Sequence, residues 1–332
     1  MLSCVRGRVR HPGHALDAQA TTLSHMLKPR ALKSGDRLAI IAPASPFDRA
    51  EFDEGVNEIR RLGFEPVYDE SVFARERYLA GSAAVRAAAL RHAWRDPAIG
   101  GVISVRGGYG SAQVLPLLDP AEARHARKPF IGYSDLTSVL NFLTTCCGLV
   151  AFHGPMLAGR LACGEAGYDR DSLINAVCRR APLGELAPAG LQTLRPGEAR
   201  GPLLGGTATQ LLASLGTPFA FTPPDGFVLF FDEVGERPYR LDRMITQLRQ
   251  SGIFARASAV VIGELPKCDE PGGDPTAHAV MSDLFKEFPG PVIIGFPSGH
   301  TTGPALTLPF GVTCRVIGDR RPRIVIEEAA VE

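Results

Sequence analysis

The segment Phe130–Thr137 places a serine where an apolar strand turns into a helix, which is a position suited to nucleophilic chemistry. At such a turn the hydroxyl of Ser134 can project into solvent beside the free N–H groups that begin the helix. The arrangement is that of a nucleophile elbow, but only Gly132 of its two glycines is present, because Leu136 occupies the second position. The alternative is that Ser134 caps the helix, a role that serine often has.

Two other groups that this chemistry needs follow later predicted strands. Asp232 and Glu233 come directly after an apolar strand, and His300 lies in a loop after another. A serine hydroxyl needs an imidazole to remove its proton, and a carboxylate holds that imidazole in the required tautomer. The order serine, acid, histidine is used by one class of serine hydrolases, although triads occur in several orders. Metal-dependent hydrolysis is less favoured, because the sequence has no HExxH motif.

Two further motifs bear on this site. His153 has apolar neighbours on both sides, which predicts a hydrogen-bonded histidine of the core or of a pocket wall. The turn Arg106–Gly110 is rich in glycine and follows a predicted strand. Because glycine permits close approach of the backbone, we expect an oxyanion hole made by the N–H of Asp135 and one N–H of Gly107 or Gly108.

The first half of the chain alternates predicted strands with predicted helices. This alternation predicts an α/β fold with a mainly parallel sheet, and it places Arg106–Gly110 and Ser134 at the carboxyl ends of strands, where active sites form. The expected strands are 38–42, 64–68, 101–105 and 130–133, and the expected helices are 50–62, 83–94, one from the glycine-rich turn to Leu118 and one from Asp135.

The second half reads as a mixed, β-rich domain. Residues from about 160 to 200 lose the earlier rhythm and suggest a connection between domains. A helix should begin at Pro238, since Leu241, Met244, Ile245 and Leu248 would share one face. The expected strands are 227–231, 259–262 and 292–294, followed by a hairpin of 313–317 with 323–326.

Composition restricts the partners and the compartment. The 332 residues are 45% apolar and 21% charged with a net charge of +1, so no broad attraction to nucleic acid or to an anionic membrane is implied. Seven scattered cysteines without a CxxC pair favour buried free thiols in a reducing compartment. No apolar stretch is long enough to span a membrane, and the first 25 residues lack the apolar core of a secretory signal. We therefore expect a cytoplasmic protein.

Taken together, these motifs resemble those of the LD-carboxypeptidases, the muramoyltetrapeptide carboxypeptidases to which the microcin-immunity peptidases are related. The resemblance runs in order from about residue 28 to 328. The motifs that carry it are Gly132–Asp135, Arg106–Gly110, Asp232–Arg243, Gly299–His300 and Leu308–Gly311.

The resemblance implies a Rossmann-like N-terminal domain, a smaller β-rich C-terminal domain and an active site between them. We divide the chain into a disordered extension (1–27), the N-terminal domain with the nucleophile (28–160), a linker (161–200) and the C-terminal domain with the acid and the histidine (201–332). By position, Ser134 is the nucleophile and His300 the general base. The implied activity is hydrolysis of the LD-peptide bond to the terminal D-alanine of a murein tetrapeptide, without a cofactor or metal, by a homodimer. The alternatives are a peptidase of the microcin-immunity type that acts on a peptide-nucleotide amide, and a non-catalytic ligand-binding protein whose serine only caps its helix.

The sequence departs from the family pattern in two places. The family usually has glutamate at the position of Asp232, so we favour Asp232 as the acid and keep Glu233 as the alternative. Relatives often have asparagine after the two glycines where this chain has Thr207. The group that binds the substrate's terminal carboxylate stays open between Arg106 and Arg240, because a guanidinium can grip a carboxylate with two hydrogen bonds.

Overall fold

The computed structural model describes residues 26–332. The predicted extension 1–27 lies outside the described residues except for its last two positions. One of these, Leu27, is paired with the body of the protein, since its N–H donates to Gly148 O at 2.8 Å and its carbonyl accepts from Val150 N at 3.0 Å.

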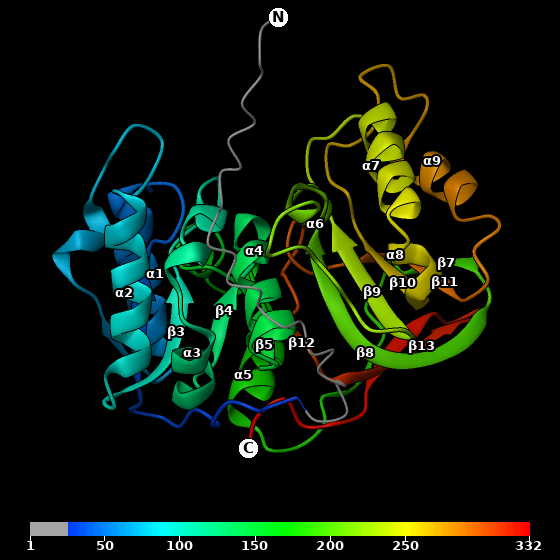
Figure 1. Cartoon of the computed structure of the whole chain (residues 1–332). Helices are drawn as coiled ribbons and strands as arrows, with labels where there is room; N and C mark the ends of the chain where they lie inside the picture. Colours follow the sequence, from blue (N-terminus) through cyan, green and yellow to red (C-terminus); the bar gives the residue numbers. More distant parts are fainter. Residues whose placement is uncertain (1–25) are drawn as a thin grey trace, which may run out of the picture.

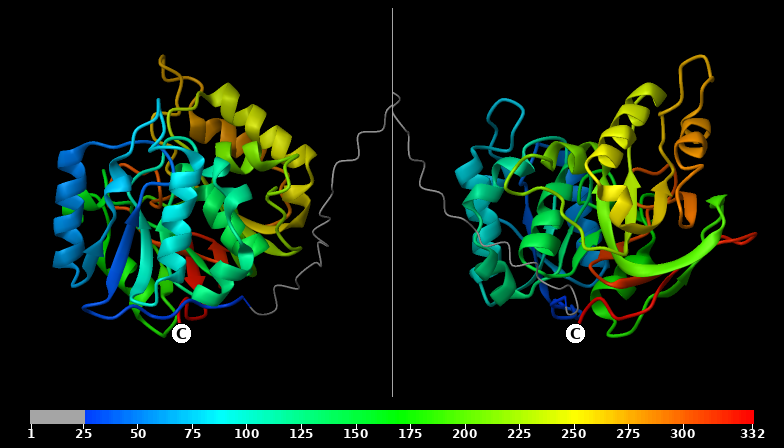
Figure 2. Two further views of the ribbon diagram at one scale, coloured as in Figure 1. Left: turned by 60° about the vertical axis from the view of Figure 1, so that its left-hand side comes forward. Right: turned by 45° about the vertical axis from the view of Figure 1, so that its right-hand side comes forward.

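The first sheet is the parallel sheet expected from the alternating pattern. Within the described residues its strand order is β12-β5-β4-β3-β1-β2, and every pair is parallel except β5 with β12. Helices lie on both sides of the strands, as the left view of Figure 2 shows. The strands are β1 (Arg37–Ile41), β2 (Glu65–Val67), β3 (Ile99–Ser104), β4 (Phe130–Gly132), β5 (Ala151–His153) and β12 (Leu308–Phe310). The helices of this part are α1 (Arg49–Arg61), α2 (Ala83–Arg95), α3 (Pro120–Ala126), α4 (Thr137–Asn141) and α5 (Arg170–Cys178).

Two local predictions in this half need correction. The helix expected between the glycine-rich turn and Leu118 is instead two short 3₁₀ turns, Ser111–Gln113 and Leu115–Leu117. Pro116 accounts for this break, because proline in a helix interior removes a hydrogen-bond donor. The helix expected from Asp135 begins as a 3₁₀ turn, Ser134–Leu136, continues as α4 and ends in a π-helical segment, Phe142–Cys146.

The second sheet is mixed and strongly curved (Figure 1). Its order among the described residues is β6-β14-β13-β8-β9-β10-β11-β7, with β8 to β11 parallel at its centre and antiparallel strands at both edges. The predicted hairpin is confirmed, because β13 pairs with β14 in antiparallel register. The strands are β6 (Gly184–Leu186), β7 (Gln192–Arg195), β8 (Gly197–Thr207), β9 (Phe227–Asp232), β10 (Ala257–Gly263), β11 (Val292–Phe296), β13 (Thr313–Gly318) and β14 (Arg323–Ile326). The helices are α6 (Ala208–Ser214), α7 (Pro238–Gln250), α8 (Ile253–Arg256) and α9 (Ala277–Leu284).

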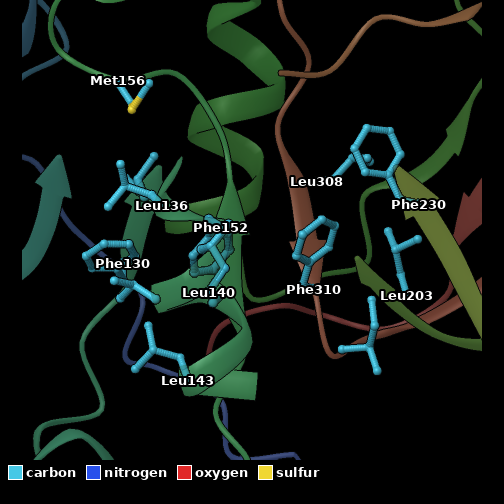
Figure 3. Packing of buried hydrophobic residues seen from close by; sticks show 14 of the residues in the cluster. Phe130, Leu136, Leu140, Leu143, Phe152, Met156, Leu203, Phe230, Leu308 and Phe310 are labelled. Carbon is cyan, nitrogen blue, oxygen red and sulfur yellow. The ribbon is translucent and has the colours of Figure 1, made fainter. Parts of the chain in front are cut away.

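The two sheets share one hydrophobic core. The strand β12 comes from the C-terminal half of the sequence but pairs with β5 of the first sheet. Its Phe310 lies between Phe152 on one side and Phe230 on the other (Figure 3), and all three side chains are fully buried. This arrangement holds the carboxyl ends of β4 and β9 in fixed relation to each other.

The stretch 161–200, predicted as a linker, contains α5, β6 and β7. The division of the chain at 160 and 201 stays a prediction.

The cysteines agree only in part with the prediction of buried free thiols. The six described cysteines are free, and Cys147, Cys268 and Cys314 are buried, whereas Cys146 and Cys163 are exposed. The seventh, Cys4, lies outside the described residues. No helix within residues 26–332 has the length and apolar character needed to span a bilayer.

Candidate active site

Ser134 occupies a strained turn directly after the buried strand β4. Its φ is +63°, in the left-handed region that non-glycine residues rarely adopt, and such a conformation costs about 1–3 kcal/mol. The 3₁₀ turn that starts at Ser134 has Tyr133 as its N-cap residue and no side-chain capping bond. Ser134 therefore does not cap the helix, and its hydroxyl is free of that structural role.

The glycine-rich turn after β3 packs directly against this serine. A Cβ built on Gly107 would lie 2.9 Å from Ser134 Cβ and 3.3 Å from the backbone N of Asp135. Such distances leave no room for a side chain, so glycine is required at this position. The turn thus brings the backbone of Gly107 beside both the Ser134 side chain and the Asp135 N–H, which are the groups predicted to act around an oxyanion.

The Asp135 side chain is buried and serves as an anchor. Its carboxylate accepts hydrogen bonds from Ser111 N at 2.8 Å and from Gln210 Nε2 at 3.1 Å. Burial raises the pKa of Asp135 and outweighs the opposing effect of the Ser111 hydrogen bonds. Because Gln210 belongs to α6, this carboxylate links the serine turn to the second sheet.

His300 and Asp232 are joined although 68 positions separate them in the chain. The Nδ1 atom of His300 lies 2.8 Å from Asp232 Oδ2, and the backbone N–H of His300 donates to the same oxygen at 2.7 Å. The other oxygen, Oδ1, accepts a hydrogen bond from the Thr207 hydroxyl at 2.8 Å. The carboxylate therefore fixes both the imidazole and the backbone that carries it.

Asp232 and His300 each shift the pKa of the other toward its charged form. Burial alone would raise the pKa of Asp232, but the charge and the hydrogen bonds of His300 outweigh it and hold that pKa at about 2. Burial likewise acts to lower the pKa of His300, but the Asp232 carboxylate outweighs it and raises that pKa above its ordinary value. The geometry favours an ionised Asp232 beside an imidazole of increased basicity.

Glu233 points elsewhere. Its Oε2 accepts hydrogen bonds from Thr209 N at 2.9 Å and from the Thr209 hydroxyl at 2.6 Å, and its Oε1 accepts from Val234 N at 3.0 Å. Successive side chains of a strand point to opposite faces, and this alternation separates the two acids. Of the two candidates, only Asp232 contacts His300 in the described residues.

Tyr133, which precedes Ser134 in the chain, connects the serine turn to His300. The ring of Tyr133, the residue before Ser134, lies 5.1 Å from the His300 ring between centroids. No hydrogen bond joins Ser134 to His300 within residues 26–332. Catalytic hydrogen bonds are often long before substrate binds, so this separation is compatible with a catalytic pair.

Comparisons with known proteins agree with this architecture. Residues 38–154 match the LD-carboxypeptidase N-terminal domain, and residues 200–316 match the LD-carboxypeptidase C-terminal domain. The chain belongs to the LD-carboxypeptidase family. It is a peptidase family, so the protein is a hydrolase.

Individual relatives cover nearly the whole chain. The murein tetrapeptide carboxypeptidase of Pseudomonas aeruginosa is 30% identical over 86% of this chain and 94% of its own length. The microcin C7 self-immunity protein MccF of Escherichia coli is 25% identical over 92% of this chain and 97% of its own length. The crystal structure of muramoyltetrapeptide carboxypeptidase from Oxalobacter formigenes superposes with a TM-score of 0.78 at 26% identity, and it covers 88% of this chain and 99% of that one.

In this LD-carboxypeptidase family member, Arg160 holds the loop that carries His300. Its guanidinium donates to the carbonyls of Gly299 at 2.9 Å, Thr301 at 2.7 Å and Gly303 at 3.0 Å. On the other side of the loop, Glu264 accepts from the N–H of Thr302 at 2.8 Å and from its hydroxyl at 2.7 Å. The loop is thus restrained by one cation and one anion.

Sequence reasoning missed the roles of Arg160 and Thr207. Nothing in the local pattern around Arg160 points to the His300 loop, because the contact joins residues about 140 positions apart. Thr207 did have a signal, since it stands where relatives often have asparagine after the two glycines. Its hydroxyl donates to Asp232 Oδ1.

The two candidate arginines differ in how far their guanidinium groups are engaged. Arg240 contacts Glu236 at 3.3 Å and the Tyr239 hydroxyl at 3.0 Å. Arg106 makes a single hydrogen bond, to Pro46 O at 3.3 Å, and no carboxylate within the described part of the chain pairs with it. Arg106 directly precedes Gly107, whose backbone packs against Ser134.

Proposed function

We propose that this protein is a serine-type LD-carboxypeptidase that removes the terminal D-alanine from a murein tetrapeptide. The observation that carries the proposal is the hydrogen-bonded pair His300–Asp232, together with a serine on a left-handed turn whose neighbour Tyr133 packs against the His300 ring. The names of its relatives from Pseudomonas aeruginosa and Oxalobacter formigenes support the substrate class. By the same resemblance we expect a cytoplasmic homodimer.

In the proposed first step, His300 Nε2 accepts the proton of the Ser134 hydroxyl while the serine oxygen attacks the carbonyl carbon of the scissile bond. Asp232 keeps the Nδ1 proton on the side facing away from the serine and stabilises the imidazolium that forms. The N–H groups of Asp135 and of Gly107 or Gly108 would stabilise the tetrahedral oxyanion, because fixed donors near 3 Å act strongly in a site that excludes water.

The second half of the reaction uses the same proton. His300 gives it to the amine of the departing D-alanine, which leaves an acyl group on Ser134. A water molecule, deprotonated in turn by His300, then attacks this ester and releases the shortened peptide. The cycle needs only the chain's own residues and water.

Recognition of a free carboxyl terminus requires a fixed cation, and we propose Arg106 for this role. It follows β3 at the edge of the sheet where Ser134 lies, and most of its donors are uncommitted. Replacing Arg106 by alanine should raise KM for the tetrapeptide more than it lowers kcat, because the lost contact would act on bound substrate and transition state alike.

The direct test is incubation with UDP-muramoyl-tetrapeptide and mass spectrometry for the loss of one alanine. A matched peptide that ends in L-alanine should remain intact, and the Ser134→Ala protein is the control for background hydrolysis. Loss of alanine from both peptides alike would contradict LD specificity.

A second candidate is a peptidase that cleaves an amide in a peptide–nucleotide conjugate. This candidate is supported by the similarity to the microcin C7 self-immunity protein, which extends over 92% of this chain. Cleavage of an aminoacyl sulfamoyl adenosine with no turnover of the murein peptide would replace the first proposal by this one.

A further inference from the structure

A second histidine lies behind the acid. His153, on β5, is fully buried, and its ring is surrounded by those of Tyr133, Phe230 and Phe310 at centroid distances of 5.9, 5.1 and 5.3 Å. Its Nδ1 lies 2.9 Å from the hydroxyl oxygen of Ser298. That hydroxyl oxygen is also 2.8 Å from Leu306 O, so its single proton can serve either neighbour.

The other ring nitrogen of His153 is unusual. Within residues 26–332 its Nε2 is buried without a hydrogen-bond partner, although buried polar atoms nearly always have one. An apolar side chain could fill the same space between the three aromatic rings, and no polar atom would then be buried without a partner. Oδ1 of Asp232 lies 4.0 Å from Nε2, which is beyond hydrogen-bond distance.

The hydrogen bonds of Asp232 leave a place for this nitrogen. Each oxygen of an ionised carboxylate can accept about two hydrogen bonds. Oδ2 already accepts two, both from His300, whereas Oδ1 accepts one, from Thr207. The open position is therefore on the oxygen that His153 faces.

Electrostatics decides which ring nitrogen of His153 should carry the proton. A lone pair on Nε2 would face a buried carboxylate, whereas an N–H at the same place would point its positive end at the anion. In a low-dielectric site this charge–dipole difference is larger than in water. The N–H on Nε2 fits this charge arrangement, and it requires the Ser298 hydroxyl to turn away from Leu306 O and donate to Nδ1.

We propose that His153 is a positioning residue for Asp232 and that the neutral imidazole of His153, protonated on Nε2, directs its N–H dipole at Oδ1 from 4.0 Å. This inference rests on the proposed function, in which Asp232 must stay ionised while His300 takes up and returns a proton. Without the N–H of His153, the carboxylate would be more basic and freer to turn away from His300.

The charged and titratable groups around His153 are few, and they are consistent with a neutral ring. Burial lowers the pKa of His153 to about 4, the Asp232 carboxylate raises it and His300 lowers it further. Around His300 itself, Asp232 and Glu233 raise its pKa and Arg160 lowers it.

Three substitutions of His153 distinguish the role of Nε2, near Asp232, from that of Nδ1, near Ser298. The amide nitrogen of His153→Gln can reach the place of Nε2, whereas that of His153→Asn can reach only the place of Nδ1, and His153→Phe keeps the aromatic packing alone. We expect the Asn and Phe variants to lose about tenfold in kcat with little change in KM. The acid limb of their kcat/KM profile should move to higher pH by roughly half a unit, because a more basic Asp232 stabilises the His300 imidazolium. The Gln variant should keep most of the activity and the original profile.

Other results would overturn the inference. If the Phe variant has the pH profile and kcat of the natural protein and only a lower Tm, His153 is a packing residue. If Asn preserves activity and Gln does not, the contact with Ser298 is the important one.

A substrate-free measurement separates this inference from the proposed function. Histidine side-chain ¹⁵N NMR of the natural protein should find the His153 proton on Nε2, and the His300 titration should shift upward in the Asn and Phe variants. A proton on Nδ1 would reject the inference. Failure to cleave the tetrapeptide, with these NMR results obtained, would reject only the substrate.

Discussion

The hydroxyl of Ser134 contributes to chemistry in this proposal, while its backbone carries the strain. Ser134→Ala should lower kcat by at least about 1,000-fold, as the loss of a triad member typically does, with little change in Tm. Ser134→Gly should be equally inactive but should unfold at a higher temperature than the Ala variant. Glycine adopts a φ of +63° without a Cβ penalty, and relief of about 1–3 kcal/mol exceeds the roughly 0.4–1 kcal/mol lost to a more flexible unfolded chain. Turnover retained by Ser134→Ala would remove serine catalysis from the proposal.

The neighbouring acids Asp232 and Glu233 should respond very differently to amide substitution. Asp232→Asn should reduce kcat by about 10,000-fold, the effect seen for this change in serine proteases, because the amide favours the wrong histidine tautomer. Glu233→Gln should keep most activity and lose mainly stability, since its hydrogen bonds are to Thr209 and Val234. Steady-state kinetics and thermal unfolding of both variants test this. The reverse pattern would move the acid to Glu233.

The pH dependence of the reaction should report the state of His300. A general base works only when it is neutral, so kcat/KM should fall as pH falls through the His300 pKa. The Asp232 carboxylate outweighs burial and raises the pKa of His300. The acid limb of kcat/KM should therefore lie above the ordinary histidine value of 6.5. The residual activity of the Asp232→Asn variant should show an acid limb of kcat/KM at lower pH than that of the natural protein. A limb below 6.5 in the natural protein would contradict the paired geometry.

At the scale of elements, the His300 loop depends on the guanidinium of Arg160. Arg160→Ala leaves the carbonyls of Gly299, Thr301 and Gly303 without this donor, and hydrogen bonds to charged groups contribute about 1.5–3 kcal/mol each. We expect at least a tenfold loss of kcat, because the imidazole is no longer held in place. Arg127→Ala is the matched control, since Arg127 donates to Lys28 O away from the site. Equal kinetic effects of both substitutions would exclude a specific role for Arg160.

At the scale of the whole molecule, the continuous core predicts that both sheets unfold together. The single tryptophan, Trp94, lies in α2 on the first sheet, whereas Phe285 packs against Phe231 and Phe254 of the second. Phe285→Ala should cost about 3–5 kcal/mol. Denaturant unfolding followed by Trp94 fluorescence should shift by the full amount, together with circular dichroism. An unchanged Trp94 transition would mean that the halves unfold independently.

Local sequence patterns determined much of this fold. Alternating apolar strands and helices predicted the parallel sheet, and the period of Leu241, Met244, Ile245 and Leu248 predicted α7, whose bounds are Pro238–Gln250. These features depend on neighbours within one or two turns, so they can be read along the chain. The same patterns put Ser134, the two acids and His300 after strands.

Only the tertiary structure decided which of these groups meet. Whether Asp232 or Glu233 contacts His300 depends on how the carboxyl end of β9 is oriented toward the His300 loop, and two adjacent acids after an apolar run give no sign of it. The pairing of β12 with β5, the contacts of Arg160 with the His300 loop and the approach of His153 to Asp232 join residues about 80 to 160 positions apart. Such contacts arise from the packing of a shared core, which a local pattern does not record.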